Sequence, residues 1–142
     1  IFPVGRLDKP SQGLIILTND GVLANKILES ENEHEKEYIV TLDREFDEEF
    51  IKGMSSGVEI CGQVTRSCKV FRMDNNTFKI ILTQGLNKQI RRMSKVFGYN
   101  VVKLERVRIM NITLDGIEYG KYRFISKSEV EEMLRLTEKN NL

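Results

Sequence analysis

The chain has 142 residues with a formal net charge of +1, and it is 40% hydrophobic and 30% charged. These values fit one globular domain of ordinary composition. No apolar run approaches the roughly 20 residues that span a bilayer, and the first residues lack the regions of a signal peptide. We therefore expect a cytoplasmic protein without a membrane partner. The chain opens on a strand-like apolar segment without an initiating Met, so we also expect a fragment of a longer protein.

Metal and thiol chemistry has few candidate residues. Cys61 and Cys68 are the two cysteines, and His34 is the single histidine. Their number and spacing do not suit a zinc or redox site. We expect both thiols to be small buried side chains in a reducing cytoplasm, and we expect His34 to lie in a charged loop. The sequence thus predicts no metal and no cofactor.

Charge is unevenly distributed along the chain. Residues 29–49 contain ten acidic and two basic residues, whereas residues 84–108 contain seven basic residues and one acidic residue. A near-neutral total therefore includes a basic segment that could follow the phosphates of a nucleic acid. A solvated helix face is the alternative.

Hydrophobic spacing and turn residues predict one α+β domain, with a mixed, mostly antiparallel sheet flanked by helices. In chain order the predicted elements are a strand over 14–18, a helix over 22–29, a strand over 36–42, a helix from about 48 to 54, strands over 64–73 and 77–83, a helix over 88–97, a long strand-like stretch over 101–114 and a helix from about 127 to 139.

Polar residues mark several ends of these elements. Asp47 and Asn87 are each expected to cap the helix that follows, and Gly98 is expected to end the second of these helices. Ser126 and Glu129 have the spacing of a capping box. Residues 14–18 are almost uniformly apolar, which predicts a strand buried on both faces.

Asp8 is the strongest candidate for chemistry. It lies in the polar run Gly5-Arg6-Leu7-Asp8, directly before the apolar strand. A loop carboxylate held by a rigid sheet suits catalysis, although a turn-forming Asp is also common at such places.

The run 5–8 followed by 13–21 (Gly-Leu-Ile-Ile-Leu-Thr-Asn-Asp-Gly) closely resembles the signature of the pseudouridine synthases that modify ribosomal RNA. The resemblance implies the pseudouridine synthase catalytic fold, with Asp8 as the nucleophile. It also implies a bacterial isomerase that converts a uridine of 23S ribosomal RNA, in a large-subunit stem-loop, to pseudouridine.

Two further blocks resemble motifs of the same family. The run Lys36-Glu37-Tyr38-Ile39-Val40 is similar to its second motif, which implies that Tyr38 lies against the target base. Stacking is one role for this tyrosine, and removal of the C5 proton is another. Residues 85–93 are similar to the third motif, which implies that Arg91 pairs with Asp8. Residues 104–109 resemble the following segment, in which Leu104 packs near the base.

The details of residues 84–87 and 104–111 favour one type within this family. They most resemble the type F synthases, which modify the RNA of the large ribosomal subunit. The same branch of the family also includes the type A synthases, which modify small-subunit RNA, and the type B and type E synthases, which modify large-subunit RNA.

The remaining site residues are expected to contact RNA. Helical spacing places the apolar residues of 88–97 on one side and its basic residues on the other, which favours an RNA-facing helix. Arg6 borders Asp8, and our hypothesis is that it enters the space left by a flipped base or contacts a flanking phosphate. The expected RNA-binding residues are Arg6, Asn87, Lys88, Arg92, Lys95, Leu104, Arg106 and Arg108.

Two other functions are compatible with parts of the pattern. A non-catalytic RNA-binding remnant of the same fold is one, although the intact Asp8, Tyr38 and Arg91 argue against it. A two-carboxylate hydrolase is another, and it would need Glu105 or Asp20 close to Asp8.

The resemblance also bears on domain organisation. It implies that residues 1–142 form part of a catalytic domain, without the N-terminal S4-type RNA-binding domain and without the first segment of the catalytic domain. We therefore expect that a strand could be exchanged with a neighbouring molecule.

Overall fold

The structure, a computed structural model, describes residues 1–29 and 34–140. Its helices are α1 (Gly21–Glu29), α2 (Glu48–Ser56), α3 (Gln89–Val96) and α4 (Lys127–Asn140). Its strands are β1 (Phe2–Val4), β2 (Gln12–Gly13), β3 (Ile16–Thr18), β4 (Lys36–Leu42), β5 (Glu59–Ile60), β6 (Gln63–Val64), β7 (Lys69–Arg72), β8 (Thr77–Leu82), β9 (Val101–Ile109) and β10 (Ile112–Thr113). The predicted α+β class is confirmed.

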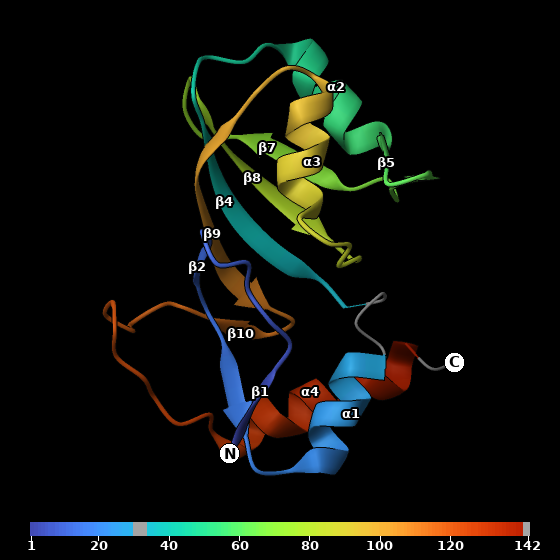
Figure 1. The fold of residues 1–142 in the computed structure, drawn as a ribbon. Coiled ribbons are helices and arrows are strands. Elements are labelled where there is room, and N and C mark those ends of the chain that lie inside the picture. The colour runs from blue at the N-terminus through green and yellow to red at the C-terminus, as the bar shows by residue number, and fades with distance from the viewer. Residues whose placement is uncertain (30–33, 141–142) are drawn as a thin grey trace.

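The main sheet is mostly antiparallel, as predicted. Its strands follow the order β10-β9-β4-β8-β7, and β2 adds to β9 as the one parallel neighbour. Figure 1 shows β4 and β9 running along the molecule, with α2 and α3 beside β7 and β8 at one end and with α1 and α4 at the other end. Within the described residues, no helix combines the length and apolar character that crossing a membrane requires.

Two separate hydrophobic cores fill the two ends. The first core packs α2 and α3 on the sheet and includes Val40, Phe50, Phe78 and Met93, each 2% exposed or less. The second core joins α1 and α4 to β1, β3 and β10, and Ile27, Ile112 and Met133 belong to it. The region between the two cores, the seam, can therefore contain a cavity.

Local sequence signals explain α2 and β4 well. The Asp47 carboxylate accepts a hydrogen bond from Phe50 N at 3.0 Å, so the predicted cap is confirmed. Phe46, Phe50 and Met54, which follow at intervals of four residues, are all buried in the first core. Strand β4 has the predicted bounds.

The prediction for residues 14–18 is wrong in two respects. The strand covers only Ile16–Thr18, and among the described residues it pairs with β1 alone. Leu14 and Ile16 are buried, but Ile15 is 43% exposed and Leu17 is 59% exposed. A strand with a single partner at the edge of the fold buries only one face. The apolar character of residues 14–18 therefore led to an overestimate of the burial of this strand.

Other predicted elements are shorter than expected. The stretch 64–73 divides into β6 and β7, and 101–114 divides into β9 and β10 with Met110 between them at a φ of 54°. Asn87 does not cap α3, because the N-cap residue is Lys88 and no side chain caps there. Gly98, with a φ of 83°, does end α3 as predicted, and its N–H donates to Lys95 O at 2.9 Å.

The cysteines and the histidine also differ from expectation. Cys61 is exposed, and Cys68 is half-buried, where desolvation raises the pKa of its thiol to about 11. His34 lies outside helix and strand, in agreement with the expected loop, but it is 2% exposed there. The charged run in the sequence therefore does not show how far this histidine is buried.

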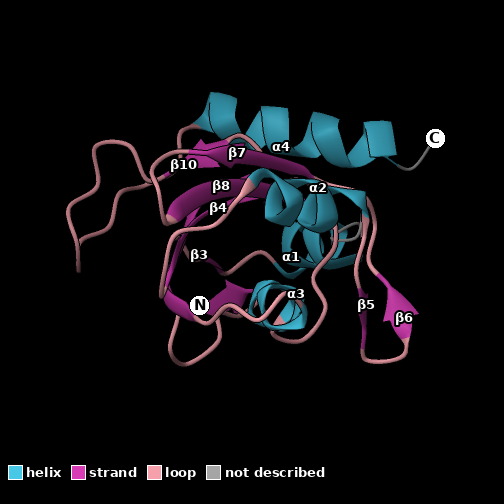
Figure 2. Ribbon diagram, turned by 90° about the horizontal axis from the view of Figure 1, so that it is seen from above, coloured by secondary structure: helices cyan, strands magenta, loops and turns pink. Residues whose placement is uncertain are grey.

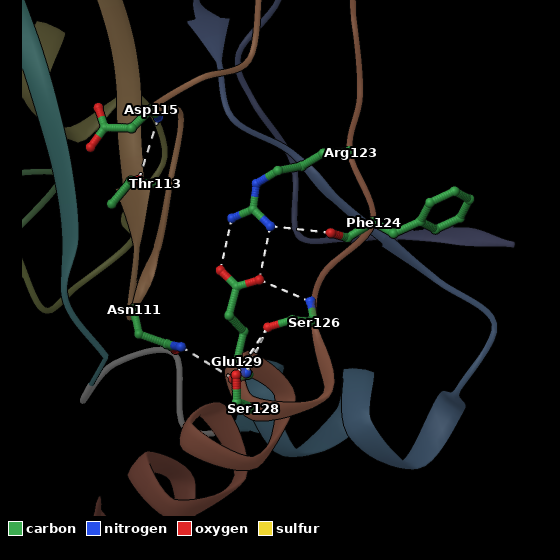
Figure 3. Close-up of polar contacts among 8 residues, drawn as sticks. All are labelled: Asn111, Thr113, Asp115, Arg123, Phe124, Ser126, Ser128 and Glu129. Carbon is green, nitrogen blue, oxygen red and sulfur yellow. Dashed lines mark hydrogen bonds and ion pairs between the residues drawn. The ribbon is translucent and has the colours of Figure 1, made fainter.

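Residues 115–126 form a long loop that stands out from the body between β10 and α4 (Figure 2). The loop is anchored at the start of α4 (Figure 3). Ser126 N donates to Glu129 Oε1 at 2.9 Å and Glu129 N donates to Ser126 Oγ at 3.2 Å, which confirms the predicted capping box. Arg123 adds two hydrogen bonds of 2.8 Å to the same carboxylate, and these lower the pKa of Glu129 to about 2.

This anchor predicts a pH-dependent stability. The pKa of Glu129 lies below its ordinary value of 4.5, so its stabilising effect is complete above about pH 5 and disappears as the pH falls to about 2. Glu129→Gln retains a side chain that can complete the capping box but loses the charge. We expect the Tm of the wild type to exceed that of Glu129→Gln by a constant amount above about pH 5, and by progressively less between about pH 4.5 and 2. A difference in Tm that stays constant from pH 2 to 6 would contradict this assignment.

The junction of β2 with β9 links the N-terminal segment to the sheet. Gln12 and Gly13 pair with Glu105 and Arg106, and Leu14 N donates to Arg106 O at 2.8 Å. Gly13 has a φ of 122°, and a Cβ at this position would collide with the backbone oxygen and nitrogen of Arg106. Only glycine therefore permits this close approach.

We expect Gly13→Ala to lower the free energy of unfolding by about 3 kcal/mol or more, because backbone strain and steric overlap add at this position. Gly62→Ala is the matched control, since Gly62 also has a positive φ, of 78°, but has open space around its Cα. That substitution should cost only about 1–2 kcal/mol. Urea denaturation of both variants measures the difference, and equal losses would show that the approach of Gly13 to Arg106 is not critical.

Candidate functional site

A hollow of about 630 Å³ lies at the seam between the two cores. Its apolar wall takes Val4 and Ile27 from the second core and Leu82, Ile90 and Leu104 from the first. This volume lies within the range of roughly 300–1,000 Å³ that is common for ligand sites. A wall built from two rigid cores can hold a small planar group in a defined position.

The loop that carries Asp8 enters this hollow directly. Residues 5–11 connect β1 to β2, and every one of them except Pro10 lines the hollow. Ser11 N donates to Asp8 O at 2.8 Å, which closes a tight turn around Lys9 and Pro10. Asp8 itself is half-buried. The loop is therefore held between two strands, and its carboxylate residue lines the hollow.

The lining of this hollow is strongly basic. Among the described residues that line it, Asp8 is the one acidic residue, and the basic residues are Arg6, Lys9, Lys36, Lys88 and Arg106. Such a surplus of positive charge favours an anionic ligand. Lys9 and Lys36 were missed by the sequence analysis, although each lies within two residues of a motif residue.

Tyr38 and Leu104 reach the hollow from adjacent strands. Tyr38 lies on β4 and is half-buried, while Leu104 lies on β9 and is 6% exposed. The structure thus brings together Asp8, Tyr38 and Leu104, which are far apart in the sequence. Asp20 and Glu105 do not line the hollow, so neither carboxylate required by the hydrolase hypothesis joins Asp8 there.

Arg91 occupies a different position from the one expected. Its Nη2 donates to Pro10 O and its Nη1 donates to Val101 O, both at 3.3 Å. Among the described residues, the ion pairs do not include one between Arg91 and Asp8. Arg91 therefore holds the backbone of the Asp8 turn against β9, rather than the carboxylate itself.

The basic residues of α3 and the two residues before this helix line two different hollows. Asn87 and Lys88 line the main hollow, whereas Arg92 and Lys95 lie on the outer side of the helix. Arg92 Nη2 donates to Asn87 Oδ1 at 3.0 Å, and Lys95 Nζ donates to Asn100 Oδ1 at 2.9 Å. Arg6 is exposed at the rim of the main hollow.

The two arginines of β9 are engaged within the protein. Arg106 is 4% exposed, and its Nε and Nη2 donate to Leu14 O at 2.9 and 2.7 Å. Arg108 pairs with Glu35 and Glu37 at 3.1 and 3.3 Å. The expected contact of these arginines with phosphates does not fit such positions, because a carbonyl oxygen or neighbouring carboxylates already accept from each guanidinium.

Gln89 was also missed by the sequence analysis. It is 5% exposed, and its Oε1 accepts a hydrogen bond from Leu86 N at 3.1 Å while its Nε2 donates to Gln84 Oε1 at 3.3 Å. These contacts hold residues 84–88, which form one wall of the hollow. Gln89 precedes Met93 by four positions and therefore lies on the apolar side of α3. A polar residue on this side is the sequence signal that could have identified Gln89.

The described residues include no group of three or more His, Cys, Asp or Glu side chains placed to hold a metal ion. The polar groups that converge on the main hollow are a carboxylate, a phenol, amides and cations. These groups can bind an anionic substrate, stack on a planar ring and supply one nucleophile or base.

Comparisons with known proteins bear on the family of this chain. The model of a family described as RNA pseudouridylate synthase matches residues 1–95. The dual-specificity RNA pseudouridine synthase RluF of Escherichia coli K12 is 55% identical over 141 residues, which are 99% of this chain and 49% of that protein. The protein of the same name from Salmonella typhi is 56% identical over 97% of this chain and 48% of its own length.

A solved structure described as a pseudouridylate synthase gives the same result for the fold. It matches with a TM-score of 0.86 and 31% identity, over 92% of this chain and 58% of that one. The chain spans about half the length of the curated relatives it matches. Since the family model covers most of the chain and includes Asp8 and Tyr38, the chain belongs to the RNA pseudouridylate synthase family.

Proposed function

We propose that the protein carrying this chain is an RNA pseudouridine synthase that isomerises a uridine in large-subunit ribosomal RNA. The observation that supports this most is the meeting of Asp8, Tyr38 and Leu104 in one basic hollow at the seam of the two cores. Each of these residues was identified from a different motif. The names of the two RluF relatives agree with this reaction on RNA.

The proposed reaction moves a glycosidic bond. The C1′–N1 bond breaks, the freed uracil rotates, and a C1′–C5 bond forms; the C5 proton leaves and N1 gains a proton. This isomerisation is redox-neutral and needs no second substrate. Asp8 assists by attacking the base or the sugar, or by taking a proton from C2′. The uridine enters the hollow as a flipped nucleotide, and unstacking it costs a few kcal/mol.

The apolar and basic parts of the hollow have separate roles in this proposal. Tyr38 stacks on the uracil ring, and Leu104 packs against it from the neighbouring strand. Arg6 and Lys88 contact phosphates that flank the target nucleotide, because both are exposed at the hollow. Arg106 stays buried and holds the Asp8 loop in place.

The proposal concerns the whole natural protein, since this chain spans about half of each RluF relative. We propose that residues 1–142 belong to its catalytic domain, and that an S4-type RNA-binding domain contributes to the choice of uridine. A cytoplasmic location suits a protein that modifies ribosomal RNA. A non-catalytic RNA-binding remnant is less well supported, because Asp8 and Tyr38 both line the hollow.

The direct test is turnover by the natural protein that contains this sequence. Tritium release from ribosomal RNA labelled at C5 of uridine reports bond transfer, because that proton leaves only when C5 joins C1′. We expect Asp8→Asn to lower the rate on the order of 10³-fold or more while RNA affinity is retained. If the Asp8→Asn variant released tritium at the wild-type rate, the proposed role of Asp8 would be refuted.

Arg91→Lys tests how the Asp8 turn is held. The guanidinium spans two carbonyl oxygens, those of Pro10 and Val101, and one ammonium group cannot reproduce this geometry. Loss of one charge-assisted hydrogen bond costs about 1.5–3 kcal/mol, so we expect turnover to fall by about 10- to 100-fold.

Arg135→Lys is the matched control, because Arg135 is exposed on α4, pairs there with Glu132 and lines neither hollow. The control variant should turn over RNA at the wild-type rate. Equal rates for Arg91→Lys and the wild type would show that this bridge does not position Asp8.

A further inference from the structure

A second hollow lies on the outer side of α3, next to the start of β9. Its volume is about 280 Å³, and its lining consists of Lys88, Arg91, Arg92, Lys95, Tyr99, Asn100 and Val101. Four of these seven residues are cations, and none is a carboxylate. Convergence of cations in a concave surface differs from a solvated helix face, where they diverge into water.

Three of the four cations of this hollow contact neutral groups. Arg91 donates to backbone oxygens, Arg92 donates to Asn87 and contacts Cys61 Sγ, and Lys95 donates to Asn100. None of them takes part in the ion pairs found among the described residues. Their charges are therefore available to an anion.

The polar surroundings of the hollow are held in place. Asp43 is the neighbouring carboxylate, and Asn100 donates to it from Nδ2 at 3.1 Å and from the backbone at 3.2 Å. The Asn100 side chain, with Asp43 on one side and Lys95 on the other, thus has a fixed orientation. Nε of Arg91 is buried and lacks a hydrogen-bond partner among the described residues.

Lys88 lines both hollows and has an unusual backbone conformation. Its φ of 50° and ψ of 37° are left-handed, which costs roughly 1–2 kcal/mol for a residue with a side chain. Glycine would adopt this conformation without strain, and the helix gains no side-chain cap from lysine here. Strained backbone conformations of this kind cluster at active and ligand-binding sites.

We propose that the second hollow binds the RNA backbone immediately next to the target nucleotide, and that the strand crosses Lys88 on its way from one hollow to the other. The inference rests on the proposed function. Phosphate oxygens suit clustered arginine and lysine donors, and one strand could place its target base in the main hollow and an adjacent phosphate in the second. Arg91 would then contact both the phosphate site and the Asp8 turn through Pro10.

Lys88→Gly separates a binding role from a structural one. It removes the cation and relieves the strain, so the Tm should be unchanged or raised. RNA affinity should fall, and the slope of log K against log salt should decrease by about 0.7 for each lost contact with a single strand. We expect Lys95→Gln to reduce the slope similarly and Lys88→Arg to restore it.

The probe is an unmodified transcript of 23S ribosomal RNA, and the protein is the natural one that contains this chain. Lys52→Gln is the matched control, because Lys52 is exposed on α2 and lines neither hollow. This variant loses the same charge and should keep the wild-type slope. If Lys88→Gly and Lys95→Gln keep the wild-type slope, or if Lys52→Gln lowers it equally, the second hollow is not a phosphate site.

Tritium release from the same transcript distinguishes this failure from a failure of the proposed function. Unchanged slopes together with turnover that depends on Asp8 would overturn the phosphate site alone. A wild-type protein that binds the transcript with the predicted slopes but releases no tritium would support the phosphate site and overturn the proposed reaction.

Discussion

The contact between the buried guanidinium of Arg106 and the carbonyl oxygen of Leu14 constrains the rest of the site. Two side-chain hydrogen bonds reach this oxygen, and Leu14 N donates back to Arg106 O. A buried charge is costly without such partners, so β2 and β9 have little freedom to shift. The close approach of Gly13 reinforces this junction. Since the loop of residues 5–11 leads directly into β2, Asp8 takes its position from this junction.

The seam between the two cores explains why the site combines apolar walls with a basic lining. Each core closes one end of the molecule, and the strands β4 and β9 bridge them. Neither core can bury the seam fully, so loops with polar residues border it. Arg91 connects two of these borders through Pro10 and Val101. The same guanidinium lines the second hollow, so a ligand bound there would contact a side chain that also holds the Asp8 turn.

Predictions from local patterns succeeded where one segment supplies both partners of an interaction. The Asp47 cap and the capping box of Ser126 with Glu129 join residues three positions apart, and both are confirmed. Predictions that depended on distant partners were less accurate. The burial of residues 14–18 was overstated because a sequence does not show that β3 has only one neighbouring strand. The sequence likewise does not show that His34 is buried.

The sequence by itself determined the α+β class, the bounds of β4 and the motif residues that meet in the hollow, because these follow from local periodicity and from residue identity at fixed spacing. Only the tertiary structure decided what each basic side chain contacts. Arg91 bonds to Pro10, 81 residues away, and Arg106 bonds to Leu14, 92 residues away. Arg108 pairs with Glu35 across 73 residues. All three arginines carry the same charge in the sequence, but hydrogen-bond partners from distant segments determine which charge remains available to a ligand.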